Sequence, residues 1–444
     1  MTKAELERKH LSELHELAAS AGVPRHRTLS REELVEELLV RGSAGPAGTV
    51  PEGEGEPKDE RPRRGRRRRR RRSGEDGERQ PRRESGGDDG EERESRRREE
   101  RPEEPDAEPI TGVLDILPQG HGFLRVAGIG EEGDDVYVSA SQIRRCELRP
   151  GDEVSGPARP PRRGERHTAL VRVEAVNGSE PTEDRSDAFD RLTPVAPHRR
   201  IPLEPEGEDV LVRAADLLAP LAFGQRVLVR AAPRSGRTTL LRGVARAIAA
   251  VPDAPGIVVL LVDERPEEVT EWRRQVPEAE IAAAPADLEP AEQVRQAELA
   301  LSRARRRAES GDDVVFLVDS LTRLAVAYRD PARIKPVFGA GRELEEEGSG
   351  SLTVIATVLS DTEDGDEAEQ AVATTESSTL ALDADLAAAG VYPALDPRRS
   401  AVSNEESLRS GDELEEARAL RAELRNLDAR LAAELLAERA RTAA

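Results

Sequence analysis

Residues 227–239 read VLVRAAPRSGRTT, an apolar run that leads into a turn and then into a helical pattern. A strand, a glycine-containing turn, a basic residue, a threonine and a helix together form the layout that cradles phosphates, because backbone N–H groups and the helix N-terminus supply positive potential. In this layout Gly236 permits close approach of the backbone, Arg237 faces the β- and γ-phosphates, and Thr238 reaches Mg²⁺. The usual first glycine is Ala231 here and the usual lysine is Arg237, so a generic strand–helix turn stays open as the alternative.

Two further apolar runs end in acidic residues. Residues 257–262 lead into the sequence DER, with Glu264 at its centre, and residues 314–318 lead into Asp319. Ligands bind at the carboxyl ends of strands in open parallel sheets, so Asp319 suits a magnesium-water ligand and Glu264 suits a group that orients or deprotonates water. An acidic residue that ends one strand is also an ordinary turn former, but this order after a phosphate loop favours a nucleotide site.

Apolar runs at 227–229, 257–262, 314–318 and 352–358, with helical segments between them such as 238–250 and 290–310, predict an α/β domain with a parallel sheet. The segment 109–178 differs, because short alternating runs (ITGVLDIL, HGFLRV, DDVYVSA, HTALVRVEAV) are separated by Gly and Pro. That pattern predicts a small five-stranded barrel.

The remaining boundaries follow from composition. We expect a multidomain chain with these parts: a small helical unit at 1–42, a disordered Arg/Glu/Gly-rich linker at 43–108, the barrel at 109–178, a connector at 179–200, the α/β domain at 201–410 and a C-terminal helix at 411–444, with its apolar stripe over 412–440.

Net charge and cysteine content restrict the kinds of partner and the cellular compartment that fit this sequence. The chain has a net charge of −21, yet residues 61–72 (RPRRGRRRRRRR) form an arginine block that either neutralises nucleic-acid phosphates or is a solvated tail offset by nearby acidic runs. Cys146 is the single cysteine, which excludes an internal disulfide and fits a reducing cytoplasm. No secretory signal or membrane-spanning run is evident, so we expect a soluble cytoplasmic protein without membrane contact.

Several stretches resemble the Rho family of bacterial transcription termination factors, among them GVLDILPQGHGFLR, VDERPEEVTEW, VDSLTRLAVAYR and VYPALD. The resemblance runs from about 110 to 400. It implies a helical N-terminal unit, an oligonucleotide-binding (cold-shock-like) barrel and a RecA-type P-loop ATPase domain. It also implies a homohexameric ring in which single-stranded RNA binds the barrels and enters a central channel. ATP hydrolysis with Mg²⁺ at subunit interfaces then pulls the RNA, so that RNA polymerase is affected indirectly.

The resemblance assigns roles to residues of this chain. It implies that Glu264 is catalytic and that Thr238 and Asp319 bind the metal. The implied nucleotide-binding residues are Gly224, Gln225, Arg226, Arg234, Ser235, Gly236, Arg237, Thr238, Thr239 and Arg265. The implied RNA-binding residues are Phe123, Arg125, Asp135, Tyr137, Glu165, Arg166 and His167. Flat rings beside cations suit base stacking, and the alternative is that the aromatic side chains are barrel core.

The departures from the family pattern cluster in the ATPase domain. Arginine replaces the phosphate-loop lysine, and the two residue types are not interchangeable at a tight phosphate site. Between Tyr328 and Phe338 the chain has only RDPARIKPV, so one of the family's two RNA-gripping channel loops is missing. The second should lie near 362–379, where no Lys or Arg occurs and five acidic residues fall within 363–369. The family's interface arginines align with Gly390 and Ser403.

Three hypotheses follow. The chain is an active Rho-type, RNA-dependent ATPase that terminates transcription. Alternatively, it is a catalytically impaired paralogue that binds RNA and nucleotide and acts as a regulator or as a partner in a mixed ring with a complete Rho, which the motif losses favour. In the third, the arginine-rich segment is a nucleic-acid tether and the main functional part.

Overall fold

The computed structural model describes Leu38 and residues 108–442, except 132, 182–186, 204–208 and 347. Apart from Leu38, all of these belong to one compact unit, Gly90–Ala444. The expected helical unit at 1–42 and the expected linker at 43–108 therefore lie almost entirely outside the described residues.

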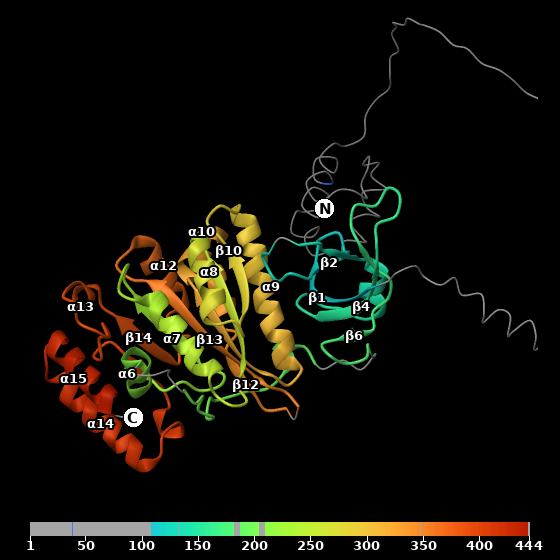
Figure 1. The fold of residues 1–444 in the computed structure, drawn as a ribbon. Coiled ribbons are helices and arrows are strands. Elements are labelled where there is room, and N and C mark those ends of the chain that lie inside the picture. Colours follow the sequence, from blue (N-terminus) through green and yellow to red (C-terminus); the bar gives the residue numbers. More distant parts are fainter. Residues whose placement is uncertain are drawn as a thin grey trace, which may run out of the picture. The chain divides into compact units, whose positions relative to one another are not determined.

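A closed barrel occupies the first part of this unit (Figure 1). Its elements are β1 (Glu108–Ile116), β2 (Gly122–Arg125), β3 (Val136–Val138), α5 (Ala140–Arg145), β4 (Glu153–Arg159), β5 (Ala169–Leu170) and β6 (Ala175–Val176). The strand order β1-β2-β3-β5-β4 closes because β1 also pairs with β4, and β6 adds to β4. Side chains such as Leu114, Leu124 and Val138 fill the interior with no exposed surface. The five-stranded barrel expected from alternation is confirmed.

The α/β domain is built on a largely parallel sheet with the order β10-β9-β11-β13-β8-β14-β15. Its strands are β8 (Arg226–Ala231), β9 (Gly256–Val262), β10 (Glu280–Ala284), β11 (Asp313–Asp319), β13 (Ser351–Leu359), β14 (Ser378–Leu382) and β15 (Ala401–Val402). The short strands β7 (Pro194–Val195) and β12 (Arg342–Leu344) pair with each other, and β12 also pairs with β13. The four strands expected from apolar runs are confirmed.

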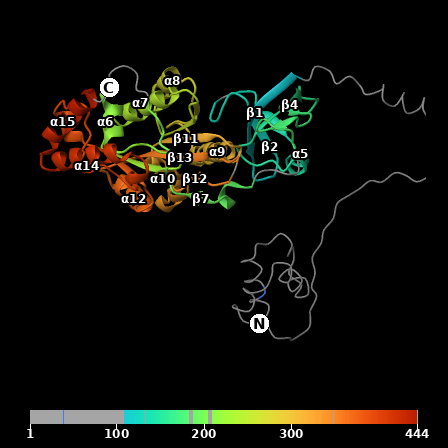
Figure 2. The ribbon, with the colours of Figure 1, turned by 90° about the horizontal axis from the view of Figure 1, so that it is seen from below.

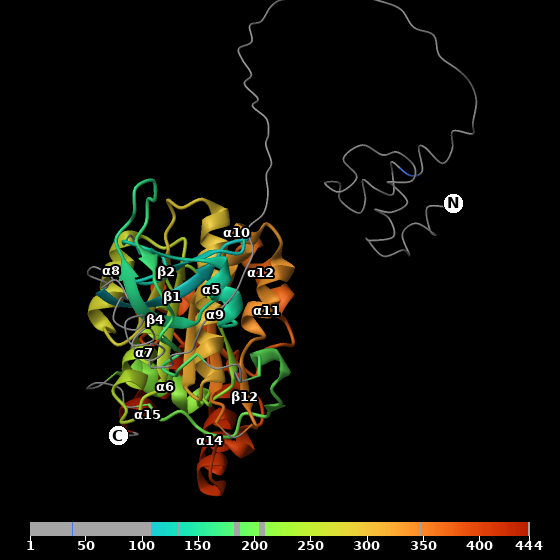
Figure 3. The same cartoon turned by 90° about the vertical axis from the view of Figure 1, so that its right-hand side faces the viewer.

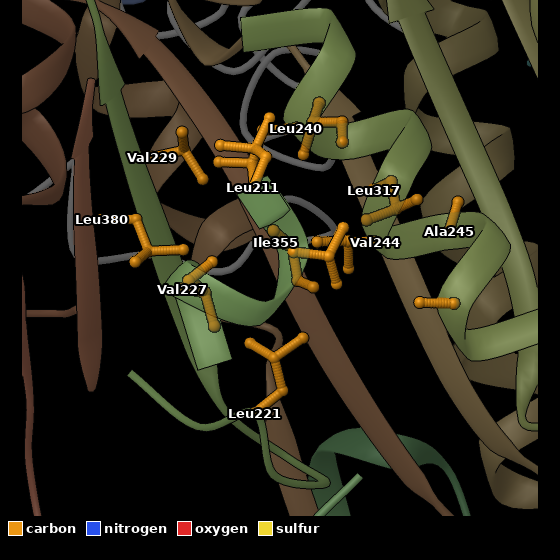
Figure 4. Packing of buried hydrophobic residues seen from close by; sticks show 14 of the residues in the cluster. Leu211, Leu221, Val227, Val229, Leu240, Val244, Ala245, Leu317, Ile355 and Leu380 are labelled. Atoms are coloured by element: carbon orange, nitrogen blue, oxygen red, sulfur yellow. The ribbon is translucent and has the colours of Figure 1, made fainter. Parts of the chain in front are cut away.

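Helices cover both faces of this sheet, because each central strand is apolar on both sides. The longer ones are α6 (Val210–Leu218), α7 (Arg237–Ala249), α8 (Pro266–Gln275), α9 (Pro290–Glu309), α10 (Leu321–Tyr328) and α12 (Glu363–Val372). The shorter ones are η2 (Phe189–Arg191), η3 (Pro331–Ile334), α11 (Lys335–Phe338), α13 (Ala384–Ala388) and η4 (Glu405–Ser407). Alternate residues of β8 divide between the two cores, with Val227 and Val229 packed beside Leu240 of α7 (Figure 4) and Leu228 on the opposite face.

The C-terminal segment forms two helices, where the sequence pattern predicted one. They are α14 (Gly411–Arg425) and α15 (Ala429–Thr442). The chain turns at Asn426, and the carboxylate of Asp428 accepts a hydrogen bond from the backbone N–H of Leu431, 2.9 Å away. A side-chain acceptor of this kind begins a new helix even where an apolar stripe continues through it.

Helix α9 of the α/β domain lies beside the barrel (Figures 2 and 3) and forms ion pairs with it. The Arg303 guanidinium lies 2.7 Å from Glu153 of β4 and 2.9 Å from Glu280 of β10. Arg295 lies 2.5 Å from Asp115 of β1. Arginine side chains of one helix therefore join the two parts of the unit.

Candidate nucleotide site and nucleic-acid surface

The turn after β8 is shaped by two residues with positive φ. Gly236 has a φ of 100°, where glycine is the least strained residue, and Arg234 has a φ of 67°. Ser235 closes the turn by donating its hydroxyl to the carbonyl of Ala232, 2.7 Å away. No side chain caps the N-terminus of α7, so its first N–H groups stay available for an anion. The turn therefore has the form that the sequence predicted for a phosphate loop.

The acidic residues that end the neighbouring strands converge on this turn. Asp319 ends β11, is fully buried, and accepts a hydrogen bond from the Thr357 hydroxyl at 2.9 Å. The Thr238 hydroxyl, at the start of α7, lies 3.4 Å from the other oxygen of Asp319. Glu264 follows β9 and is largely buried. The structure thus brings Thr238, Glu264 and Asp319 together, as parallel strand ends should.

Arg237 lies between the two carboxylates. Its Nη2 donates to Glu264 at 2.5 Å, and its Nε lies 2.8 Å from Oδ1 of Asp319. Burial and the nearby Asp319 raise the pKa of Glu264 to about 7, and Arg237 opposes that rise. Burial also raises the pKa of Asp319, again against the effect of Arg237. The arginine that replaces the usual lysine is thus the cation that balances both acids.

An open cavity of about 610 Å³ lies over this cluster. It is lined by residues of the phosphate loop, α7, the DER segment and α10: Ala232, Pro233, Arg234, Gly236, Arg237, Thr238, Thr239, Arg242, Asp263, Glu264, Arg265, Glu268, Arg323 and Leu359. Five arginines and three carboxylates are among them, so the lining has an excess of positive charge. Such a lining suits a polyphosphate.

A second hollow of about 250 Å³ shares Arg234, Gly236 and Thr239 with the first. The predicted nucleotide residue Ser235 lines it together with Tyr392, whose side chain is 54% exposed. An exposed ring beside a phosphate loop suits stacking on a flat base. Tyr392 belongs to the VYPALD stretch, but no role was predicted for it from the sequence. The scarcity of tyrosine could have indicated a role for this residue, because the chain has only three tyrosines.

Three predicted nucleotide residues lie elsewhere. Gly224, Gln225 and Arg226 precede or begin β8, at the end of the strand opposite to the phosphate loop. The N–H of Gly224 donates to the Thr353 hydroxyl at 2.9 Å, and the Arg226 guanidinium donates to the carbonyl of Thr375 at 2.6 Å. None of the three lines either cavity, and their contacts here are structural.

Four rings gather on the surface of the barrel. Phe123 and Tyr137 are opposite each other on β2 and β3, with ring centroids 5.9 Å apart. His167 lies 5.0 Å from Phe123, and His121 lies 5.5 Å from Tyr137. Tyr137 is 36% exposed, and none of these rings belongs to the apolar core of the barrel. The alternative that the aromatic side chains are barrel core is therefore wrong.

Charged residues flank these rings. Arg125 pairs with Asp135 and lies 2.6 Å from Asp115, which also binds Arg295 of α9. Arg159 lies 2.7 Å from Glu165 and holds the pKa of that carboxyl down, to about 2.

The adjoining positions Arg166 and His167 are exposed. Of the seven predicted RNA-binding residues, Phe123 and Arg125 lie on β2 and Tyr137 lies on β3, while Asp135 directly precedes β3. Glu165, Arg166 and His167 lie between β4 and β5. The RNA contacts of all seven remain a prediction.

The segments expected to bear channel loops are short or acidic. After α10, residues 329–338 form only η3 and α11, and the side chains of Ile334, Val337 and Phe338 are buried in the core. The segment 363–372 is helix α12, which begins with the Thr362 hydroxyl as its cap and has three acidic residues in its first turn. Glu369 of this helix lies 2.9 Å from Arg230. Helix α12 itself contains no lysine or arginine.

Comparison with known proteins agrees with this geometry. The Rho termination factor RNA-binding domain matches residues 110–182, and the nucleotide-binding domain of the ATP synthase alpha/beta family matches residues 212–335. Proteins named transcription termination factor Rho are similar over most of the chain. The Bacillus subtilis protein is 42% identical over 318 residues, which cover 67% of this chain and 74% of that protein. The Haemophilus influenzae protein is 41% identical over 345 residues, covering 71% and 81%.

The chain belongs to the Rho family. A third Rho, from Rhodopirellula baltica, is 40% identical over 341 residues, and the match spans 70% of this chain and 65% of that longer protein. Among solved structures, an ATPase from a type III secretion system matches with a TM-score of 0.42 and 24% identity over 50% of this chain and 69% of that one, a likeness too weak to bear on function. Within the described residues, no helix is long and apolar enough to cross a membrane.

Proposed function

We propose that this Rho family member binds single-stranded RNA through the barrel and ATP through the phosphate loop, with little RNA-stimulated turnover. The observation that carries the proposal is the position of Arg237 between Glu264 and Asp319. Arg237 holds the Glu264 carboxylate in a charge-assisted hydrogen bond, so Glu264 must break that contact before it can accept a proton from water. The same guanidinium is paired with Oδ1 of Asp319, the carboxylate expected to hold a metal-bound water.

The proposed RNA surface consists of the rings of Phe123 and Tyr137, with His121 and His167 at their edges. Stacking on exposed rings binds single strands without a fixed sequence. The cations beside them provide phosphate contacts, although Arg125 is shared with two carboxylates. The match to the Rho RNA-binding domain covers this surface.

The resemblance aligns the family's interface arginines with Gly390 and Ser403, so on this alignment a neighbouring copy of this chain would bring no such cation. An arginine supplied in trans contributes about 10³–10⁵-fold to the rate in other phosphoryl-transfer enzymes. A ring formed with a complete Rho would restore it at some interfaces. We therefore propose that the chain acts as a regulator or as a partner in a mixed ring, and not as a motor that works alone. On this proposal it acts in the cytoplasm and affects RNA polymerase indirectly.

The deciding experiment measures ATP hydrolysis by the full chain with and without cytidine-rich RNA. We expect RNA to change the rate by less than about twofold, and the rate to lie about 10³-fold below that of a complete Rho assayed beside it. Glu264→Ala serves as the matched variant and should change little. RNA-stimulated turnover that this variant abolishes would instead establish the second candidate, an active termination factor. That candidate is favoured by the convergence of Thr238, Glu264 and Asp319.

The tether hypothesis makes a separate prediction about the arginine-rich segment. If that segment is the main functional part, deletion of residues 43–108 abolishes RNA binding. If the barrel is the main RNA site, the deletion leaves a chain that still binds RNA with a weaker salt-dependent component.

A further inference from the structure

The site between Glu264 and Asp319 is already filled by a cation. The Arg237 guanidinium contacts both carboxylates, at 2.5 Å and 2.8 Å, and its side chain is only 16% exposed. Mg²⁺ requires near-octahedral oxygen ligands at about 2.0–2.1 Å and keeps several waters. A guanidinium in hydrogen-bond contact with both acids already balances their negative charge, so the two carboxylates attract a divalent cation less than unpaired acids would. The donor set of Thr238 and Asp319 is therefore a poor fit for Mg²⁺ while Arg237 keeps this position.

The rest of the lining supplies further positive charge. Arg242 of α7 and Arg323 of α10 line the same cavity. Nη1 of Arg242 is buried and has no hydrogen-bond partner within the described part of the chain, since Glu268 is 3.6 Å away. Free ATP is more negative than its magnesium complex, so a site that takes the free anion needs additional cations. An arginine-rich lining meets that need, because guanidinium groups bind phosphate oxygens in pairs.

We propose that this site binds a nucleoside triphosphate as the free anion, with the Arg237 guanidinium in place of a magnesium ion. The proposal rests on the nucleotide binding proposed above and deepens it. Arg237 uses Nε and Nη2 for the two carboxylates, which leaves Nη1 to donate to a phosphate oxygen. The uncapped N–H groups of α7 face the same anion. A side chain fixed in this way balances charge whether or not a divalent cation is present.

The test compares ATP binding with magnesium chloride and with EDTA by isothermal titration calorimetry on the full chain. The wild type should show the same affinity, within about twofold, under both conditions. Arg237→Lys should bind ATP with magnesium and lose about tenfold or more in affinity with EDTA, because lysine is a compact cation without a fork to span both acids. Arg246→Lys, on the same helix but outside the cavity, is the matched control and should behave like the wild type.

Three results would overturn the proposal. One is a tenfold or greater loss of wild-type affinity in EDTA. Another is a wild-type protein that binds no ATP in either buffer while Arg237→Lys binds it, which would mean that the Arg237 side chain blocks the nucleotide site. The third is no binding by either protein. RNA affinity, measured on the same samples by fluorescence anisotropy with a cytidine-rich oligonucleotide, reports separately on the proposed function. Retained RNA binding beside magnesium-dependent ATP binding would remove this inference alone.

Discussion

The barrel surface and the nucleotide site both contain residues expected from the family pattern, but the side chains differ in how free they are to contact a ligand. On the barrel, Tyr137 is 36% exposed and its ring is open to a ligand. At the nucleotide site, Arg237 forms ion pairs with Glu264 and Asp319. Stacking needs only an accessible face, whereas hydrolysis needs acids that are free to act. Binding and turnover can therefore be lost separately, and this contrast underlies the proposed function.

The face near α12 extends this contrast. A channel loop that grips RNA must project from the domain, yet Ile334, Val337 and Phe338 pack into the core. Carboxylates at the start of α12 repel a phosphate backbone through solvent, and salt screens that repulsion within about 10 Å. The barrel is thus the better candidate for the main RNA contact among the described parts.

The largest effect should come from removing the rings of the barrel. Replacing Phe123 and Tyr137 by alanine should weaken RNA binding by about 1–3 kcal/mol for each stacked base that is lost. Fluorescence anisotropy with a cytidine-rich oligonucleotide measures this directly. Tyr392→Ala is the matched control in the α/β domain, because its ring is also exposed but lines the nucleotide hollow. Equal losses from both changes would break the contrast between the two regions.

A smaller effect is expected at the contact between the regions. Arg303 binds Glu153 of the barrel and Glu280 of the sheet and is nearly buried. Arg303→Met keeps the packing of the stem and removes both ion pairs, so we expect a loss of about 1–2 kcal/mol and a Tm lower by about 2–4 °C. Arg273→Met removes a more exposed pair to Glu131, which should cost less than about 1 kcal/mol.

Circular dichroism melts of the two variants test this difference. An unchanged Tm for Arg303→Met would mean that the ion pairs of Arg303 add nothing measurable to the stability of the contact between the barrel and the sheet. RNA affinity should stay at the wild-type value in both variants, because neither residue lies near the rings.

The sequence predicted most of what the backbone does at the site. Apolar runs located β8, β9, β11 and β13, and the rule for parallel strand ends brought Glu264 and Asp319 to the phosphate loop. It missed β10, whose sequence EIAAA is dominated by alanine. Alanine favours helix intrinsically, and this strand forms because it pairs in parallel with β9.

The direction of a side chain was beyond the sequence. The pattern placed Arg237 toward phosphates, but nothing in it indicated that the guanidinium would span two acids from different strands. That contact depends on the spacing between strand ends, which only the folded sheet sets. The two-helix C-terminus was missed for a related reason, since a continuous apolar stripe conceals the new cap at Asp428.

The smallest effect should come from a single exposed cation beside the rings. Arg166 lies in the exposed segment before His167, and Arg166→Ala should weaken RNA binding only a few fold while reducing the slope of log affinity against log salt by about 1. Arg172→Ala is the control, because Arg172 is exposed on the same barrel but already paired with Glu174 at 2.5 Å. A salt slope that responds to Arg172 and not to Arg166 would place the phosphate path on another side of the barrel. Because the rings would still be required for stacking, that outcome would change the predicted position of the RNA phosphates on the barrel but not the predicted position of the stacked bases.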